Sequence, residues 1–168
     1  MDAGKRVTVV EGSPVVYERI PCDKRLALFE DFDTSEVFDA IVASHVLEHV
    51  NDPVALLKRL RKWSKRLIVL VPNAQSWHRK LAKQMGMIPS IYQLSARDVI
   101  EGHVRVYDKP TLDIDLSLAG WEAKKWRGFF LKTLPNSMML GHSPELIRAM
   151  NEIYVRPCEA ANIGVICE

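Results

Sequence analysis

An acidic side chain comes directly after the first apolar run of this 168-residue sequence. Residues 6–10 read Arg-Val-Thr-Val-Val, which favours a short β-strand, and Glu11 and Gly12 follow. In an open α/β sheet, ligands bind at the carboxyl ends of the strands, where a carboxylate can accept hydrogen bonds from both hydroxyls of a ribose. Glu11 is therefore a candidate nucleotide-binding residue, and the alternative is a carboxylate on a solvated turn.

Polar residues also follow the next two apolar runs. Glu30 and Asp31 come after a predicted strand over residues 26–29, and the alternative for them too is a solvated acidic turn. Residues 38–43 are nearly continuous in apolar character, as in a strand that is buried on both faces. Ser44, His45 and Val46 follow that strand, so the imidazole lies at the same edge of the predicted sheet.

Residues 45–49 read His-Val-Leu-Glu-His, which matches the inverted zinc-peptidase motif H-x-x-E-H. That chemistry needs both histidines on one face of a helix, with a glutamate beside the metal-bound water. Here His45 directly follows a predicted strand, and the next helix signal is Asp52-Pro53. Zinc peptidase is therefore a remote alternative, and we expect no metal.

Two further segments offer polar groups. Asn73 ends an apolar run over residues 66–72, the clearest buried strand of the sequence. In the later segment Gly-His-Val-Arg-Val-Tyr-Asp, alternation places His103, Arg105 and Tyr107 on one side if the chain is extended. A histidine there could accept a proton from a substrate hydroxyl or amine. The same side chains could instead hold one segment of the protein against another.

The elements that position these residues alternate between strands and helices. Ser-Pro, Asp-Pro or Lys-Pro pairs predict helix starts at residues 13–14, 52–53, 109–110 and 143–144. Two further strands are predicted over residues 121–130 and 161–167. This order predicts an α/β fold with a mostly parallel, doubly wound sheet. We expect one domain over residues 1–168, with lid or insert segments at 73–107 and 131–157.

The composition is that of an ordinary soluble globular protein, with 48% hydrophobic and 26% charged residues. A net charge of +2 is too small to indicate nucleic acid as a partner. No apolar run approaches ~20 residues and no signal peptide is present, so we expect neither a membrane nor secretion. The three cysteines are odd in number and lack metal-ligand spacing, which favours free thiols in the cytoplasm.

The block over residues 38–53 strongly resembles the fourth-strand region of class I S-adenosylmethionine-dependent methyltransferases, and the segments around Glu11, Asn73 and His103 resemble other parts of that family. The resemblance implies a Rossmann-like sheet with antiparallel terminal strands and methyl transfer to an oxygen or nitrogen of a small molecule. For S-adenosylmethionine, the resemblance assigns the ribose to Glu11 and Gly12, the adenine to Glu30, Asp31 and Phe32, and the methionine part to Ser44, His45 and Val46. On the acceptor side it implies contacts by Asn73, Arg105 and Tyr107. It also implies that His103 acts as a base.

The family also has a first strand followed by Gly-x-Gly, which lies between the strands predicted at residues 6–10 and 38–43. No pair of glycines in this sequence has that spacing after a strand. Three explanations stay open: the chain is a piece of a longer protein, a partner chain or second copy fills the position, or the protein is a non-catalytic binding or regulatory subunit. An unfilled position would leave two strand edges without hydrogen-bond partners.

Overall fold

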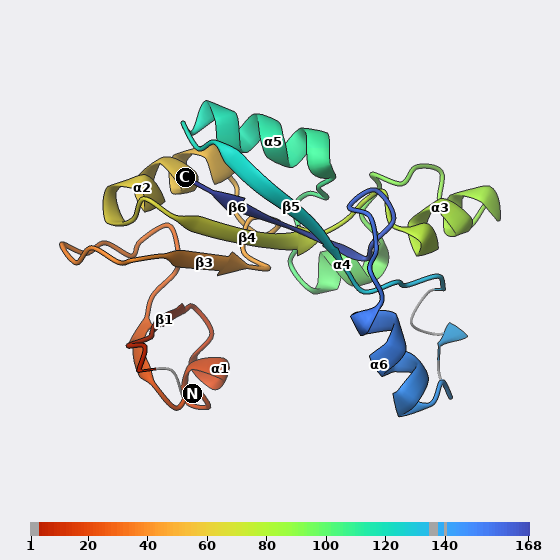
Figure 1. Ribbon diagram of the computed structural model, residues 1–168, viewed down its shortest axis with the longest axis horizontal. Coiled ribbons are helices and arrows are strands. Elements are labelled where there is room, and N and C mark those ends of the chain that lie inside the picture. Colours follow the sequence, from red (N-terminus) through yellow and green to blue (C-terminus); the bar gives the residue numbers. More distant parts are fainter. Residues whose placement is uncertain (1–3, 135–137, 140) are drawn as a thin grey trace. The chain divides into compact units, whose positions relative to one another are not determined.

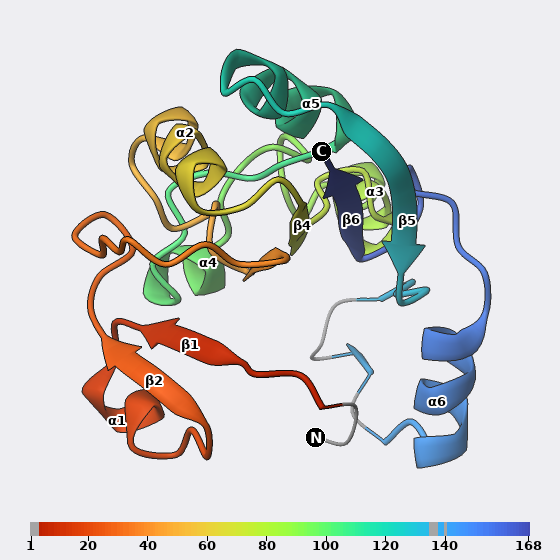
Figure 2. The ribbon, with the colours of Figure 1, turned by 60° about the vertical axis from the view of Figure 1, so that its left-hand side comes forward.

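The computed structural model describes residues 4–134, 138, 139 and 141–168. By its internal contacts the chain divides into two compact units, Met1–Glu36 and Val37–Glu168. Each unit contains its own β-sheet, with strands labelled in Figures 1 and 2. The predicted α/β class is confirmed.

The first unit is a β–α–β segment. β1 (Thr8–Glu11) and β2 (Asp23–Leu26) pair in parallel, and α1 (Pro14–Tyr17) lies between them in sequence. The Ser13 hydroxyl caps α1 by accepting a hydrogen bond from the Val16 amide at 3.4 Å. The predicted helix start is therefore confirmed.

The position predicted for the second strand is wrong. β2 begins at Asp23, whereas the apolar residues 26–29 lead into a turn in which the Leu28 carbonyl accepts hydrogen bonds from the Asp31 and Phe32 amides at 3.1 and 3.0 Å. The sequence of β2 is Asp-Lys-Arg-Leu, without an apolar pattern. β2 is a strand because its backbone pairs with β1. A two-stranded sheet buries little apolar surface, so its strands need no hydrophobic pattern that a sequence could reveal.

The second unit contains a four-stranded sheet in the order β3-β4-β6-β5. β3 and β4 are parallel, and β6 is antiparallel to both of its neighbours, as Figure 1 shows. The predicted antiparallel arrangement near the chain end is confirmed. The strand bounds are Ile41–Ser44 for β3, Leu67–Pro72 for β4, Ala123–Phe129 for β5 and Asn162–Cys167 for β6.

β3 is an edge strand of this sheet. It begins at Ile41 rather than at residue 38, and its hydrogen-bonded neighbour is β4. Val42 is 64% exposed and Ala43 is 5% exposed, so one face of the strand is covered and the other is open. The expectation of burial on both faces is wrong, because an apolar run alone does not show which strand neighbours are present.

Two helices cover one face of the sheet. α2 (Pro53–Trp63) and α5 (Lys109–Leu118) lie side by side there (Figures 1 and 2). Leu57 and Leu112 from these helices are fully buried. The indole N–H of Trp121, which follows α5, donates a hydrogen bond to the Leu57 carbonyl at 2.9 Å. Leu67, Val69 and Val71 of β4 are also fully buried, so one face of this strand belongs to the core.

Side-chain caps begin the helices that the Pro pairs predict. The Asp52 carboxylate accepts a hydrogen bond from the Ala55 amide at 2.9 Å at the start of α2. The Ser143 hydroxyl accepts one from the Leu146 amide at 3.2 Å at the start of α6 (Pro144–Glu152). Each cap satisfies an amide that has no partner within its helix.

Short helices occupy the two segments predicted as lids or inserts. α3 (Trp77–Gln84) and α4 (Ala96–Ile100) lie within residues 73–107, and α6 lies within residues 131–157. Residues 135–137 and 140 of the latter segment lie outside the described residues. Across the described part of the chain, no helix combines the length and the apolar character that a membrane crossing requires.

The three cysteines are free, as predicted. Cys22 is half-buried in the first unit, while Cys158 is exposed and Cys167 is buried in the second.

Candidate active site

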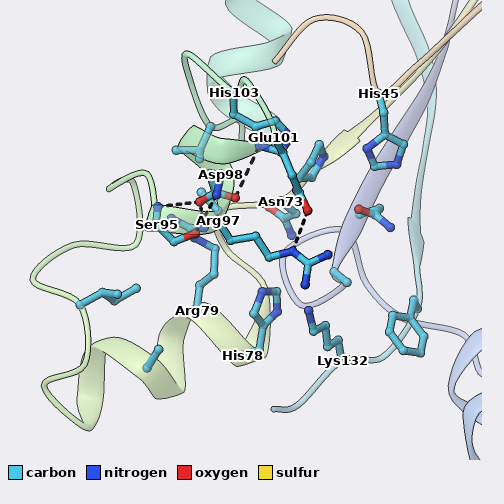
Figure 3. Close-up of a pocket in the computed structure, with 18 of the residues that line it drawn as sticks. His45, Asn73, His78, Arg79, Ser95, Arg97, Asp98, Glu101, His103 and Lys132 are labelled. Carbon is cyan, nitrogen blue, oxygen red and sulfur yellow. Dashed lines mark hydrogen bonds and ion pairs between the residues drawn. The ribbon is translucent and has the colours of Figure 1, made fainter. Parts of the chain in front are cut away.

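A cavity of about 600 Å³ lies in the second unit, a volume within the range of small-molecule sites. It extends from the carboxyl ends of β3 and β4 to α3, α4 and the segment after β5 (Figure 3). Open α/β sheets bind ligands at this edge. The polar side chains that line it are His45, Asn73, His78, Arg79, Ser95, Arg97, Asp98, Glu101, His103, Lys132 and Asn162.

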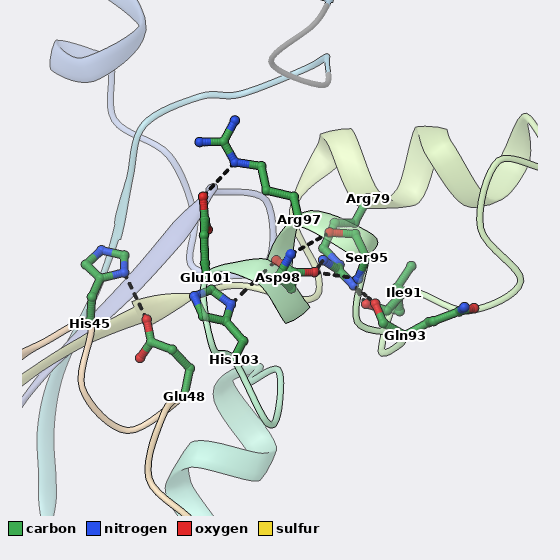
Figure 4. A network of polar contacts seen from close by, with 10 residues as sticks. All are labelled: His45, Glu48, Arg79, Ile91, Gln93, Ser95, Arg97, Asp98, Glu101 and His103. Carbon is green, nitrogen blue, oxygen red and sulfur yellow. Dashed lines mark hydrogen bonds and ion pairs between the residues drawn. The ribbon is translucent and has the colours of Figure 1, made fainter.

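His45 is held by the backbone and by a buried carboxylate. Its φ is 55°, a left-handed conformation that costs a non-glycine residue about 1–2 kcal/mol, and such strain concentrates at functional sites. Its Nδ1 lies 3.0 Å from Oε1 of Glu48, a side chain that is 1% exposed (Figure 4). The hydrogen bond to Glu48 raises the pKa of His45, although partial burial opposes the shift. The result is a half-exposed histidine with one ring nitrogen engaged.

His103 lies deeper in the wall. Its side chain is 10% exposed, and its Nδ1 lies 3.5 Å from an Asp98 oxygen (Figure 4). Burial opposes ionisation of Asp98, but hydrogen bonds from Ser95 and the charge of Arg79 outweigh it and hold the pKa of the carboxyl below its usual value. The His103 ring also packs edge to face against His49, with centroids 4.7 Å apart. These contacts hold the imidazole in place.

Basic side chains gather on the opposite side of the cavity. His78 comes from α3, Arg97 from α4, and Lys132 from the segment after β5 (Figure 3). Burial and the positive charges of Lys132 and Arg79 lower the pKa of His78 to about 4. Burial and the charge of Arg97 also lower the pKa of Lys132. His78 and Lys132 are therefore partly buried basic groups whose charged forms are disfavoured, whereas the side chain of Arg97 is exposed.

The side chains predicted on the acceptor side make contacts within the protein. Asn73 is buried and lines the cavity, while its amide donates hydrogen bonds at 2.8 Å to the carbonyls of Pro157 and Ala160. Arg105 donates to two carbonyls of the loop after β3, and the Tyr107 hydroxyl donates to Asp115 at 2.8 Å. Arg105 and Tyr107 do not line the cavity, so among these three only Asn73 is placed at it.

The acidic residue predicted to bind ribose ends β1 in the first unit. Oε1 of Glu11 accepts a hydrogen bond from the Ser13 amide at 2.7 Å, and its Oε2 has no hydrogen-bond partner among the described residues. A Cβ atom at Gly12 would lie 3.1 Å from the Leu28 side chain, so the backbone of Gly12 passes close to Leu28. A carboxylate with a spare oxygen at a strand end fits a nucleoside with free hydroxyls.

The other predicted cofactor residues are accessible. Glu30 and Asp31 are exposed on the turn after β2, and Phe32, which ends this turn, is half-buried. Ser44 is exposed at the end of β3, and Val46 is half-buried two residues later.

The H-x-x-E-H segment does not form the helix that a zinc peptidase requires. Residues 45–50 are a turn and bend after β3. Side-chain donor atoms of Glu48, His49 and His103 lie within 4.8 Å of one another, but Glu48 is already bonded to His45 and the two other rings pack against each other. This segment therefore lacks the helical geometry of a zinc-peptidase site.

Sequence reasoning missed two parts of the cavity: the pairing of His45 with Glu48 and the basic group of His78, Arg97 and Lys132. The sequence shows a histidine and a glutamate three residues apart after a predicted strand, but this spacing alone does not predict that the two side chains meet in a turn. The three basic residues occur in separate segments without a motif, so no local signal could have grouped them.

The strand order, the reversed β6 and a cavity at the strand ends define the class I methyltransferase fold. The solved structures of S-adenosylmethionine-dependent methyltransferases from Thermotoga maritima (possible histamine N-methyltransferase) and Mesorhizobium loti share this fold. The first has 18% identity and a TM-score of 0.61, covering 95% of this chain and 71% of that one. The second has 12% identity and a TM-score of 0.59, covering 96% and 80%.

A Haloferax volcanii complex of a methyltransferase activator with a methyltransferase is also similar, with 10% identity, a TM-score of 0.58 and coverage of 96% and 71%. No curated protein matches the chain. The family model described as "Methyltransferase domain" matches residues 2–125. The chain belongs to this methyltransferase family, and its cofactor is S-adenosylmethionine.

Proposed function

We propose that this protein transfers a methyl group from S-adenosylmethionine to an oxygen or nitrogen of a small molecule bound in the cavity, with His45 as the proton acceptor. The hydrogen bond between His45 and buried Glu48, at the carboxyl end of β3, is the observation that carries the proposal. The volume of about 600 Å³ supports a small-molecule acceptor.

The Glu48 carboxylate determines which nitrogen of His45 is reactive. A carboxylate is an acceptor, so it favours the tautomer with the proton on Nδ1 and leaves a lone pair on Nε2. The same contact stabilises the imidazolium that forms when Nε2 takes a proton from the acceptor. His103 is less suited to this role, because it is 10% exposed and held by Asp98 and His49.

We propose that the other predicted cofactor residues bind S-adenosylmethionine. Glu11 and Gly12 would hold the ribose, Glu30, Asp31 and Phe32 the adenine, and Ser44 and Val46 the methionine part of the cofactor. When bound, the cofactor supplies an electrophilic methyl group for in-line attack. Positioning contributes much of the catalysis in such a reaction, and the backbone at the end of β3 places both His45 and Ser44.

The test compares His45→Ala with His142→Ala, a control at a histidine that does not line the cavity. Acceptor methylation and calorimetric binding of S-adenosylhomocysteine are measured for both. We expect His45→Ala to lower kcat by about 10²–10⁴-fold, as for loss of a general base, while cofactor-product affinity stays within about twofold. Unchanged kcat with lost affinity would place His45 on the cofactor side instead and overturn the base assignment.

A further inference from the structure

The basic side of the cavity contains an ammonium group without a carboxylate partner. Arg79 pairs with Asp98 at 3.4 Å, and Arg97 pairs with Glu101 at 2.6 Å. Lys132 makes no side-chain hydrogen bond or ion pair with any described residue, although it is partly buried. The cavity therefore has a surplus positive charge, and it is located at Lys132.

A second polar group beside Lys132 is also unsatisfied. Nδ1 of His78 is buried and has no hydrogen-bond partner within the described part of the chain. The backbone amide of His78 donates to the Lys132 carbonyl at 3.2 Å, which holds the two residues next to each other. Buried polar atoms in folded proteins nearly always have a partner, so an unsatisfied one in a cavity wall is available to a ligand atom.

The electrostatics of this group agree with the geometry. Burial disfavours the charged forms of His78 and Lys132, and their positive neighbours add to this effect, whereas the charge of Asp98 opposes it. An anion would reverse this balance, because a negative charge within ~4–6 Å favours the charged form of a basic group. Figure 3 shows Arg97, His78 and Lys132 directed toward a common region of the cavity, so one anionic group could contact all three.

We propose that the methyl acceptor carries a carboxylate or phosphate group, which binds to Lys132 and His78 with Arg97 at the rim. This inference rests on the proposed function, since it names the substrate class of the same cavity. The anionic group would fix one end of the acceptor and leave its hydroxyl or amine to be placed near His45, which lines the same cavity.

The first experiment measures anion binding without methyl transfer. Inorganic phosphate is titrated into the full chain at constant ionic strength while the imidazole NMR signals of His78 are recorded. We expect the His78 signals of the wild type to shift in a saturable way. In Lys132→Gln the affinity for phosphate should fall by about tenfold or more, as for loss of a charged hydrogen bond. Lys132→Arg should retain the affinity of the wild type. Lys124→Gln is the matched control, because Lys124 pairs with Glu122 and does not line the cavity.

Equal phosphate affinity in the wild type and Lys132→Gln would overturn the proposal. It would also be overturned if sodium chloride shifted the His78 signals as phosphate does.

The second experiment measures methylation of matched acceptors such as 4-hydroxybenzoate and 4-hydroxybenzamide. The proposal is supported if the wild type prefers the anionic acceptor and Lys132→Gln does not. It is overturned if the wild type and Lys132→Gln methylate the anionic and the neutral acceptor equally, and methyl transfer itself then stands. Phosphate binding without turnover of any acceptor supports the anion site and counts against the proposed function.

Discussion

At the scale of single residues, the pair formed by His45 and Glu48 joins an accessible imidazole to a buried carboxylate. The histidine has a left-handed backbone and an accessible ring, whereas the glutamate is almost fully buried. A buried carboxylate is stabilised only by good partners, and here the described partner of its Oε1 is the imidazole. The pair should therefore respond strongly to the loss of either member.

The pH dependence of kcat tests this pair. The hydrogen bond to Glu48 raises the pKa of His45, and the base must be neutral to accept a proton. Activity should therefore rise with pH through a midpoint above the ordinary value of about 6.5 for histidine. Glu48→Gln removes the negative charge, so the midpoint should move to lower pH. A midpoint that is unchanged, or that moves to higher pH, would contradict the assigned role of Glu48.

At the scale of elements, helix starts were predictable because their causes are local. The caps at Ser13, Asp52 and Ser143 each act on an amide within the first helical turn, beside a proline that fixes φ. The position of β2 was not predictable in this way. That strand pairs with β1 through its backbone and has a polar sequence, so its cause lies in a distant segment.

The open edge of β3 gives a prediction for hydrogen exchange. The amides of Ile41 and His45 donate to the β4 side, at 3.0 and 2.9 Å. Amides alternate between the two edges of a strand, so those of Val42 and Ser44 face the edge without a described strand neighbour. We expect Val42 and Ser44 to exchange rapidly in NMR or mass-spectrometric experiments.

Ala43 serves as the internal control, because its amide faces β4 and should be protected. Strong protection at Val42 and Ser44 would contradict the prediction and indicate that another strand pairs at this edge. Protection that increases with protein concentration would identify this strand as part of a second copy of the chain.

At the scale of the whole molecule, the sequence predicted the sheet better than the cavity. The buried run of β4 and the alternation of strands and helices determine the fold class, and both are visible in the sequence. The basic side of the cavity depends on His78 and Lys132, which are 54 positions apart (132 minus 78) and meet only through packing of the chain. Such long-range proximity has no periodicity that a single sequence could reveal.

The distribution of the core predicts that the two units differ in autonomy. Every buried apolar side chain of the described residues lies in the second unit, between Ala43 and Cys167. Domains below about 40 residues rarely fold without additional links. We expect residues 37–168 alone to unfold cooperatively in urea and residues 1–36 alone to show no transition, with circular dichroism as the measurement.

The control for this experiment is Leu112→Ala in the larger fragment, which removes a fully buried side chain and should cost about 2–5 kcal/mol. A transition that does not respond to this substitution would not report the core. Absence of any cooperative transition in residues 37–168 would show that the first unit is required for folding.

Two of the free thiols, Cys158 and Cys167, make the protein a reporter of its own unfolding. Burial raises the pKa of Cys167 to about 12, and this residue lies in a strand paired on both sides, so its thiolate is inaccessible to alkylating reagents in the native state. Cys158 is exposed and reacts without opening. The ratio of the labelling rates at Cys167 and Cys158, divided by the same ratio in the unfolded chain, therefore reports the fraction of open molecules in a cell lysate, without purification and without a catalytic assay.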